Sequence, residues 1–335
     1  MSRLTERSTP TGLTGRATIT RLTERASVLG YRAGWSIVRR MPGRFAYGAF
    51  DLIADVCWRR GGKGVERMRS NYATVRPELT SAGLDSLVRA GMRSYLRYWC
   101  DSFRLPDRSV EDLVHGVRVV GMDPVRAHLK SGRSAVVFLG HMGNWDFAGA
   151  WSTTQLAPVT TVAERLKPEE LFDEFVAFRE GLGMRILPLT GGSDVFRELT
   201  KACRAGALVA LLADRDLTNG GIEVDFCGQR ARMAVGPAAL AVNTGAALHP
   251  TIVHYEPQPE GGGWRTVVTF HDAVAQPTQG TSREKIQAMT QACADVLTEG
   301  VREHTHDWHM MQRVFTRDLV DDRTTKGSEK AGESR

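Results

Sequence analysis

Residues 135–146 read Ala-Val-Val-Phe-Leu-Gly-His-Met-Gly-Asn-Trp-Asp, and this stretch decides the fold. Its apolar run ends at Gly140, which predicts a buried strand over residues 135–139. Asn144 is a favourable helix-capping residue, so we expect a helix to begin near Trp145. A strand, a short turn and a helix in this order are typical of an open α/β sheet, in which ligands bind at the carboxyl ends of the strands.

The same stretch contains the residues that we expect to carry chemistry. His141 follows the strand directly, and Asp146 returns a carboxylate from the first helical turn. A histidine that a carboxylate orients can act as a general base on a hydroxyl group. The alternative is a structural pair, in which a strand-end histidine is hydrogen-bonded to an acid at the start of the helix. The spacing alone does not separate these two interpretations.

Short strands alternate with helices through the rest of the chain from residue 117, which predicts a largely parallel sheet flanked by helices. The strands are expected at 117–120, 135–139, 159–162, 185–189, 207–213, 221–226, 248–254 and 265–270. The helices are expected at 124–130, 145–155, 169–181, 193–205, 237–244 and 283–303. An earlier helix over 84–103 carries an apolar stripe that we interpret as part of the core.

The amino-terminal part of the chain is strongly basic. Residues 1–44 contain nine arginines and two glutamates, a formal charge of +7 in a chain whose total is +6. Residues 19–41 combine these arginines with apolar residues at helical spacing, which is typical of an amphipathic helix on an anionic membrane surface. The alternative is that the apolar stripe packs on the body of the protein. No apolar run approaches the roughly 20 residues that span a bilayer.

The 335 residues suggest one large domain between two polar ends. We expect a disordered lead-in at 1–17, a single domain at 18–318 and a disordered tail at 319–335. Within the domain, 18–110 form a helical, membrane-associating part and 111–318 form an α/β catalytic core. The five cysteines are scattered and form no CxxC pair, which argues against disulfides or a zinc site. We expect no metal, no nucleic-acid partner and a monomer.

Four further stretches hold polar residues near predicted turns and strand ends. They begin at Glu164-Arg165, at Arg179-Glu180, at Asp214-Arg215-Asp216 and at Leu248. Arginines at such places can bind phosphates, because the guanidinium group matches phosphate oxygens. The alternative for each arginine is an exposed ion pair.

Taken in order, these motifs resemble those of the HxxxxD acyltransferases. The resemblance is to the late lipid A acyltransferase group and, within it, to the mycobacterial phosphatidylinositol mannoside acyltransferases. It rests on residues 140–146, on 163–168, on 214–216, on 224–228 with Pro250, and on 308–315, and it covers about residues 20–318. Asp225 and Cys227 depart from the related lipid A enzymes, which leaves the acceptor open.

The resemblance implies transfer of a long acyl chain, usually palmitoyl, from acyl-CoA to a mannose hydroxyl of phosphatidylinositol mono- or dimannoside. It implies no other cofactor, and it implies a peripheral location on the cytoplasmic face of the plasma membrane. His141 is the expected base, Asp146 its orienting carboxylate and Glu223 a second carboxylate of the relay. Backbone amides around Gly143 and Asn144 are the expected oxyanion donors. The remaining substrate-binding candidates are Asn144 itself, Glu164, Arg165, Arg179, Arg230 and Arg232, of which the four arginines are expected near the phosphates of CoA.

Two other functions stay open at this point. The first is an acyltransferase for another acceptor, such as a lipid A precursor-like glycolipid or a lysophospholipid. The second is a noncatalytic protein that binds anionic lipid through its amino-terminal part.

Overall fold

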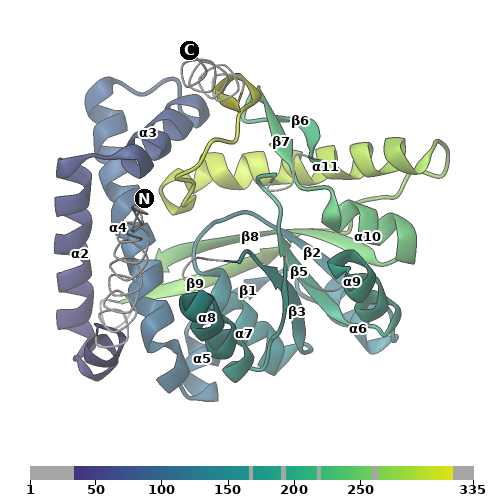
Figure 1. Ribbon diagram of the computed structural model, residues 1–335, viewed down its shortest axis with the longest axis horizontal. Coiled ribbons are helices and arrows are strands. Elements are labelled where there is room, and N and C mark those ends of the chain that lie inside the picture. The colour runs from purple at the N-terminus through teal and green to yellow at the C-terminus, as the bar shows by residue number, and fades with distance from the viewer. Residues whose placement is uncertain (1–33, 166–168, 190–193, 217–219, 259–262, 320–335) are drawn as a thin grey trace, which may run out of the picture.

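The computed structural model describes residues 34–165, 169–189, 194–216, 220–258 and 263–319 (Figure 1). One sheet organises them, in the strand order β1-β9-β8-β2-β5-β3-β4. Its strands are β1 (Val117–Val120), β2 (Ala135–Leu139), β3 (Val159–Ala163), β4 (Arg185–Pro188), β5 (Leu208–Leu212), β8 (Ala247–Pro257) and β9 (Trp264–Phe270). Neighbouring strands are parallel except for β8 and β9. The predicted α/β fold with a mostly parallel sheet is confirmed.

Helices cover both faces of this sheet (Figure 1). They are α5 (Val110–His115), α6 (Asp123–Lys130), α7 (Trp145–Gln155), α8 (Glu169–Gly181), α9 (Val195–Arg204), α10 (Gly236–Thr244) and α11 (Ser282–Glu303). Strand β2 is buried on both sides, as its continuous apolar sequence predicts. Val136 and Phe138 belong to a core with α9, α10 and α11, whereas Val137 and Leu139 belong to a core with α7 and α8.

Three helices stand together at one end of the molecule, and the third of them lies beside the ends of β8 and β9 (Figure 1). They are α2 (Gly43–Arg60), α3 (Lys63–Val75) and α4 (Ser81–Arg104), and α4 contacts both of the others. The predicted helix over 84–103 corresponds to α4. Of the amphipathic helix predicted over 19–41, only residues 34–41 are described, and residues 34–40 are helical. The rest of that helix, the lead-in at 1–17 and residues 320–335 lie outside the described residues.

The structure also differs from the sequence prediction in several elements. Helices α2 and α3 lie in the part predicted to be helical, although their bounds were not predicted, and neither α5 nor β7 (Gln229–Met233) was predicted. β7 pairs antiparallel with β6 (Ile222–Phe226) in a separate two-stranded hairpin. Cys227 and Gly228 form its turn with φ of 51° and 78°, which suits the twist of a two-residue hairpin loop. The predicted strand over 248–254 is longer and continues through Pro250 without interruption.

Among the described residues, none of the helices combines the length and the apolar character needed to cross a membrane.

Candidate functional site

His141 lies in the turn between β2 and α7, at the carboxyl end of the sheet. Asn144 ends this turn, and its Oδ1 accepts a hydrogen bond from the Phe147 backbone N–H at 2.9 Å. The predicted helix cap is therefore confirmed. The His141 side chain is 20% exposed, so the imidazole is held by the protein on most sides and remains accessible on one.

Asp214 is the carboxylate that orients this imidazole. Its Oδ1 lies 2.6 Å from His141 Nδ1, and its Oδ2 accepts the His141 backbone N–H at 2.8 Å. Burial alone raises the pKa of Asp214, but the nearby His141, together with hydrogen bonds from His141 and Trp308, lowers it below its usual range. An ionised carboxylate can only accept, so Nδ1 is the donor, and in the neutral imidazole the lone pair then lies on Nε2. The arrangement leaves Nε2 able to take a proton.

The prediction that Asp146 orients His141 is wrong, because the carboxylate bonded to Nδ1 of His141 belongs to Asp214. Asp146 is buried and accepts hydrogen bonds from Tyr98 Oη at 2.8 Å and from Arg179 Nε at 2.7 Å. Its place in the first turn of α7 directs the carboxylate toward α4 and α8, which carry these two partners. Burial alone lowers the pKa of Arg179, but Asp146 raises it above its ordinary value.

Arg179 is therefore not a free cation for the phosphates of CoA, in contrast to the sequence prediction. Its guanidinium group is largely buried and forms an ion pair with Asp146. The ion pair between Asp146 and Arg179 instead joins α7 to α8 beside the site.

A segment near the carboxyl end of the chain holds the turn that carries His141. His309 donates its backbone N–H to the His141 carbonyl at 2.8 Å, and Gly143 donates its own to the Asp307 carbonyl at 2.9 Å. Gly143 has a φ of 54°, and a Cβ there would lie 2.7 Å from the Val253 carbonyl oxygen. Only glycine fits this position. Because the Gly143 amide is already bonded, the prediction that it serves as an oxyanion donor is wrong.

A serine, a histidine and an aspartate also meet beneath this segment. Ser94 Oγ donates to Asp307 Oδ1 and lies 2.9 Å from His309 Nε2. The serine is the middle member and all three residues are buried, so the group does not have the order of a nucleophilic triad. Burial lowers the pKa of His309 to about 3, which keeps this imidazole neutral. The cluster fastens the 305–310 segment to α4.

Glu223 lies away from His141, so it does not complete the predicted relay. It is exposed on β6, and its carboxylate is 3.7 Å from Arg230, which also pairs with Asp225. Arg232, on β7, donates to the Gly221 carbonyl at 3.4 Å. These predicted residues thus lie together on the β6–β7 hairpin. The carboxylate that contacts His141 belongs to Asp214 instead.

The remaining predicted residues lie after β3. Glu164 accepts a hydrogen bond from Arg215 at 2.9 Å, and Arg165 lies 3.4 Å from Glu169. The sequence reasoning did not single out Arg215 itself or Trp308 as site residues. Trp308 is wholly buried and donates from Nε1 to Asp214 Oδ2 at 2.9 Å.

A narrow apolar cavity of about 70 Å³ lies between α7 and the sheet, next to this site. Trp145 and Leu212 line it near the carboxyl ends of the strands, and Leu208 lines it four residues deeper, about 13 Å along the strand. Gly149 and Met184 line its side, and a Cβ on Gly149 would lie 2.8 Å from Met184 Sδ. The cavity therefore leads from the edge of the sheet into the apolar core.

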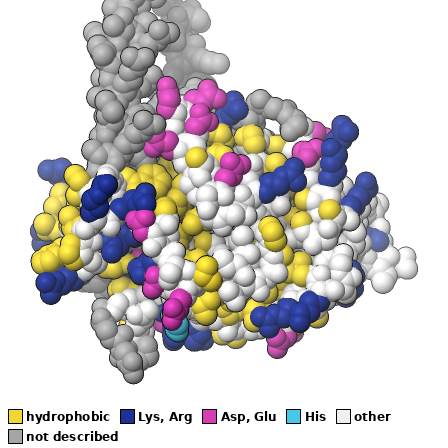
Figure 2. Space-filling view, turned by 90° about the horizontal axis from the view of Figure 1, so that it is seen from below, with side chains coloured by type: hydrophobic (Ala, Val, Ile, Leu, Met, Phe, Trp, Pro, Cys, Tyr) yellow, Lys and Arg dark blue, Asp and Glu magenta, His cyan; other side chains and the backbone are white. Residues whose placement is uncertain are grey.

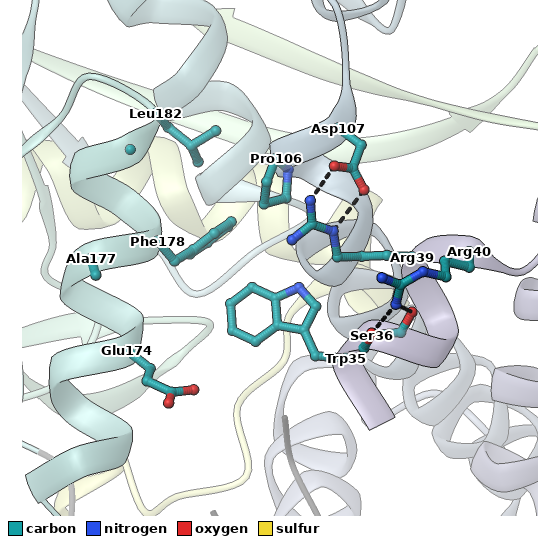
Figure 3. Close-up of a pocket in the computed structure, with 11 residues that line it drawn as sticks. Trp35, Ser36, Arg39, Arg40, Pro106, Asp107, Glu174, Ala177, Phe178 and Leu182 are labelled. Atoms are coloured by element: carbon teal, nitrogen blue, oxygen red, sulfur yellow. Dashed lines mark hydrogen bonds and ion pairs between the residues drawn. The ribbon is translucent and has the colours of Figure 1, made fainter. Parts of the chain in front are cut away.

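A wider cavity of about 750 Å³ lies between residues 35–40, the turn after α4 and the end of α8 (Figure 3). Trp35 and Phe178 meet there edge to face, Arg39 pairs with Asp107, and Arg40 pairs with Ser36. It is lined by no histidine among the described residues, and it shares no described lining residue with the narrow cavity. We therefore place the candidate active site at His141.

The chain is also similar in sequence to known proteins. Residues 13–317 match the family model described as bacterial lipid A biosynthesis acyltransferase. The phosphatidylinositol mannoside acyltransferase of Mycolicibacterium smegmatis is 42% identical over 299 residues, which cover 89% of this chain and 94% of that protein. The phosphatidylinositol mannoside acyltransferase of Mycobacterium tuberculosis H37Rv is 42% identical over 296 residues, which cover 88% of this chain and 90% of that protein.

Proposed function

Because the chain belongs to the bacterial lipid A biosynthesis acyltransferase family and is an acyltransferase, we propose that it acylates a mannose hydroxyl of phosphatidylinositol mono- or dimannoside. The donor in this proposal is a long-chain acyl-CoA, palmitoyl-CoA above all, and His141 is the general base. The relatives' names support the acceptor. The single observation that carries the mechanism is the hydrogen bond between His141 Nδ1 and Asp214 Oδ1.

The reaction in this proposal follows from the tautomer that Asp214 selects. Nε2 of His141 takes the proton of the sugar hydroxyl while the hydroxyl oxygen attacks the thioester carbonyl carbon. A C–O bond forms, and the carbonyl electron pair moves to the oxygen. When this intermediate collapses, the C–S bond breaks and the imidazolium returns its proton to the CoA thiolate. Asp214 stabilises the imidazolium between these two steps.

The narrow cavity beside Trp145 is our candidate for the acyl chain. Its lining is mostly apolar, it extends into the core, and Trp145, which contacts His141, lines it. Its 70 Å³ is smaller than the roughly 300–1,000 Å³ of ordinary ligand pockets, so a long chain has to displace side chains on entry. Met184, an unbranched and adaptable side chain in its wall, is suited to such a movement.

The phosphates of CoA remain assigned by proposal to Arg165, Arg230 and Arg232. Arg165 and Arg230 form ion pairs with exposed carboxylates, and such pairs contribute little stability. A phosphate group can therefore replace the carboxylate at low cost. Arg179 is excluded from this set by its buried pair with Asp146.

The acceptor is a lipid, and we propose that the enzyme reaches it from the cytoplasmic face of the plasma membrane as a peripheral protein. Phe45, Leu52 and Ile53 lie on one face of α2, and their exposed fractions lie between 47% and 63%. Arg59 and Arg60 end the same helix. Figure 2 shows hydrophobic and basic side chains intermixed over this end of the molecule. Such a surface suits an anionic bilayer.

Acyl transfer to defined acceptors tests the proposed reaction. Purified protein is incubated with palmitoyl-CoA and a phosphatidylinositol mannoside, a lipid A precursor or a lysophospholipid, and the products are identified by mass spectrometry. We expect palmitoylated mannoside, and we expect its loss in His141→Ala but not in the matched variant His115→Ala, which changes an exposed histidine on α5. Product with only another acceptor overturns the proposed substrate. Lipid binding without any product favours the noncatalytic alternative.

Vesicle binding tests the membrane surface separately. We expect cosedimentation with vesicles that contain phosphatidylglycerol, and we expect added salt to weaken it by screening. Leu52→Ser/Ile53→Ser should release the protein, whereas Val114→Ser/Val120→Ser, at similarly exposed residues elsewhere, should not. Equal binding by the two variants overturns the assignment of α2.

A further inference from the structure

Trp145 occupies the boundary between the candidate base and the apolar cavity. Its ring contacts His141 edge to face, with 5.7 Å between ring centroids, and it stacks on Tyr98 at 4.1 Å. Trp145 also lines the cavity. Tyr98 is itself fixed by its hydrogen bond to Asp146. The indole is therefore held in one orientation beside His141.

The indole N–H of Trp145 is buried and has no hydrogen-bond partner among the described residues. Buried tryptophan N–H groups usually have one, because a donor buried without a partner destabilises the fold. Two other tryptophans of this chain follow that rule. Trp35 donates to the Phe103 carbonyl at 2.8 Å, and Trp308 donates to Asp214. Trp145 differs from these two tryptophans because its N–H is unsatisfied, and it lies beside His141.

A second unsatisfied donor lies next to it in the chain. The side-chain amide nitrogen of Asn144 is also buried without a partner among the described residues. Asn144, however, is wholly buried and does not line the cavity. Its oxygen already caps α7. Of the two donors, only that of Trp145 belongs to a side chain that borders the space where an acyl group would enter.

We propose that the Trp145 N–H binds the carbonyl oxygen of the acyl thioester and stabilises the oxyanion that forms on it. This inference rests on the proposed function and names a catalytic residue for it. When the acceptor oxygen bonds to the thioester carbon, the carbonyl electron pair moves to the oxygen, and the indole N–H faces the new negative charge. The charge returns to the carbon when the C–S bond breaks, and no proton leaves the indole.

The Gly143 amide, one of the donors expected from the sequence, is already bonded to the Asp307 carbonyl. A side-chain donor beside His141 can take its place. Donors that are fixed before the reaction and shielded from water are the most effective ones for a developing oxyanion, and removal of one lowers kcat by about 10²–10³-fold in a well-studied protease. A neutral indole donor on a rigid ring meets both conditions.

Steady-state kinetics of Trp145→Phe test the proposal, because phenylalanine keeps an aromatic ring and removes the N–H. We expect kcat to fall about 10- to 100-fold while KM for palmitoyl-CoA changes less than about threefold. Trp264→Phe, a tryptophan on β9 away from His141, is the matched control and should keep wild-type kinetics. A Trp145→Phe enzyme with wild-type kcat overturns the proposal, as does a variant in which only KM rises.

A second measurement removes any dependence on packing. Replacement of Trp145 by 3-benzothienylalanine keeps the ring shape and exchanges N–H for sulfur. With palmitoyl-CoA labelled with ¹³C at the carbonyl and bound to His141→Ala protein, we expect the carbonyl stretch to move to higher frequency on this replacement. An unchanged frequency overturns the proposal. Wild-type transfer activity decides the proposed function independently, so the failure of one inference is distinguishable from the failure of the other.

Discussion

Trp308 donates its indole N–H to Oδ2 of Asp214 at 2.9 Å, on the same oxygen that accepts the His141 backbone N–H. The other oxygen faces His141 Nδ1. Three donors thus fix a fully buried carboxylate, and that carboxylate fixes the imidazole. The orientation of His141 therefore depends on Trp308, which lies almost a hundred positions after Asp214 in the chain.

The first prediction concerns Asp214. We expect Asp214→Asn to lower kcat for acyl transfer by about 10²–10⁴-fold, because a neutral amide neither selects the Nδ1–H tautomer nor stabilises an imidazolium. Asp123→Asn, at an exposed position of α6, is the control. Kinetics with palmitoyl-CoA and a phosphatidylinositol mannoside measure both. An Asp214→Asn enzyme within a few-fold of the wild type would contradict the dyad.

Trp308→Phe should have a smaller effect of the same kind. One hydrogen bond to a charged group contributes about 1.5 kcal/mol or more, and roughly 1.4 kcal/mol corresponds to a tenfold change in rate. We therefore expect kcat to fall about tenfold, with little change in KM. Thermal melting shows whether the fold persists. Unchanged kcat in a folded Trp308→Phe protein would show that the other donors suffice to position Asp214.

Arg179 should matter for stability. Arg179→Met leaves the buried Asp146 carboxylate without its cation, and the loss of one partner of a buried pair costs about 3–5 kcal/mol. Urea unfolding measures this loss. The double variant Arg179→Met/Asp146→Leu removes both charges and should recover much of the stability. If Arg179→Met unfolds like the wild type but binds acyl-CoA weakly, this arginine binds phosphate after all.

Gly149 should limit the length of the acyl chain. Leucine at this position fills part of the cavity and presses on Met184, so Gly149→Leu should favour donors shorter than palmitoyl-CoA. Competition among acyl-CoAs of different length, followed by mass spectrometry, gives the preference. Thr154→Leu, at an exposed position of the same helix, is the control. An unaltered preference in folded Gly149→Leu protein would exclude this cavity as the acyl site.

Acid should destabilise the fold through His309. Burial lowers its pKa to about 3 from an ordinary 6.5, so the unfolded chain binds more protons than the folded one between these values. Its contribution to stability is complete above pH 6.5 and is lost as the pH falls toward 3. From about pH 7 to about pH 4.5 we expect a loss of roughly 2–3 kcal/mol from this residue. Urea unfolding at both pH values should show a smaller loss in His309→Asn.

Much of the core and the position of the candidate base were predictable from local sequence. The apolar run before His141 and the capping residue Asn144 determine a strand and a helix within a few residues, and local signals suffice for both. Helix α2 was given no bounds because Asp51 and Asp55 interrupt its apolar residues. Strand β7 escaped prediction because Ala231 and Met233 are its only small or apolar residues, too few for a clear period-two pattern.

The partner of His141 was not predictable in the same way. Asp146 is near in sequence, whereas Asp214 becomes near only because β2 and β5 are neighbours, with Leu139 opposite Leu212. That register places Asp214, two residues beyond the end of β5, opposite His141, two residues beyond the end of β2. Strand order is a long-range property of the fold. Asp214 did follow a predicted strand, and this position was the one available signal.

The 305–310 segment has a practical consequence for protein engineering. Tyr72 Oη donates to the Trp308 carbonyl at 2.9 Å, and Asn71 donates to the Met310 carbonyl at 2.9 Å, so α3 is fastened to the residues that buttress His141. A protein shortened to the α/β part would lose these hydrogen bonds together with helices α2 to α4. If such a protein were inactive, the cause would be the loss of the support for the His141 turn, and not the loss of a contact with lipid.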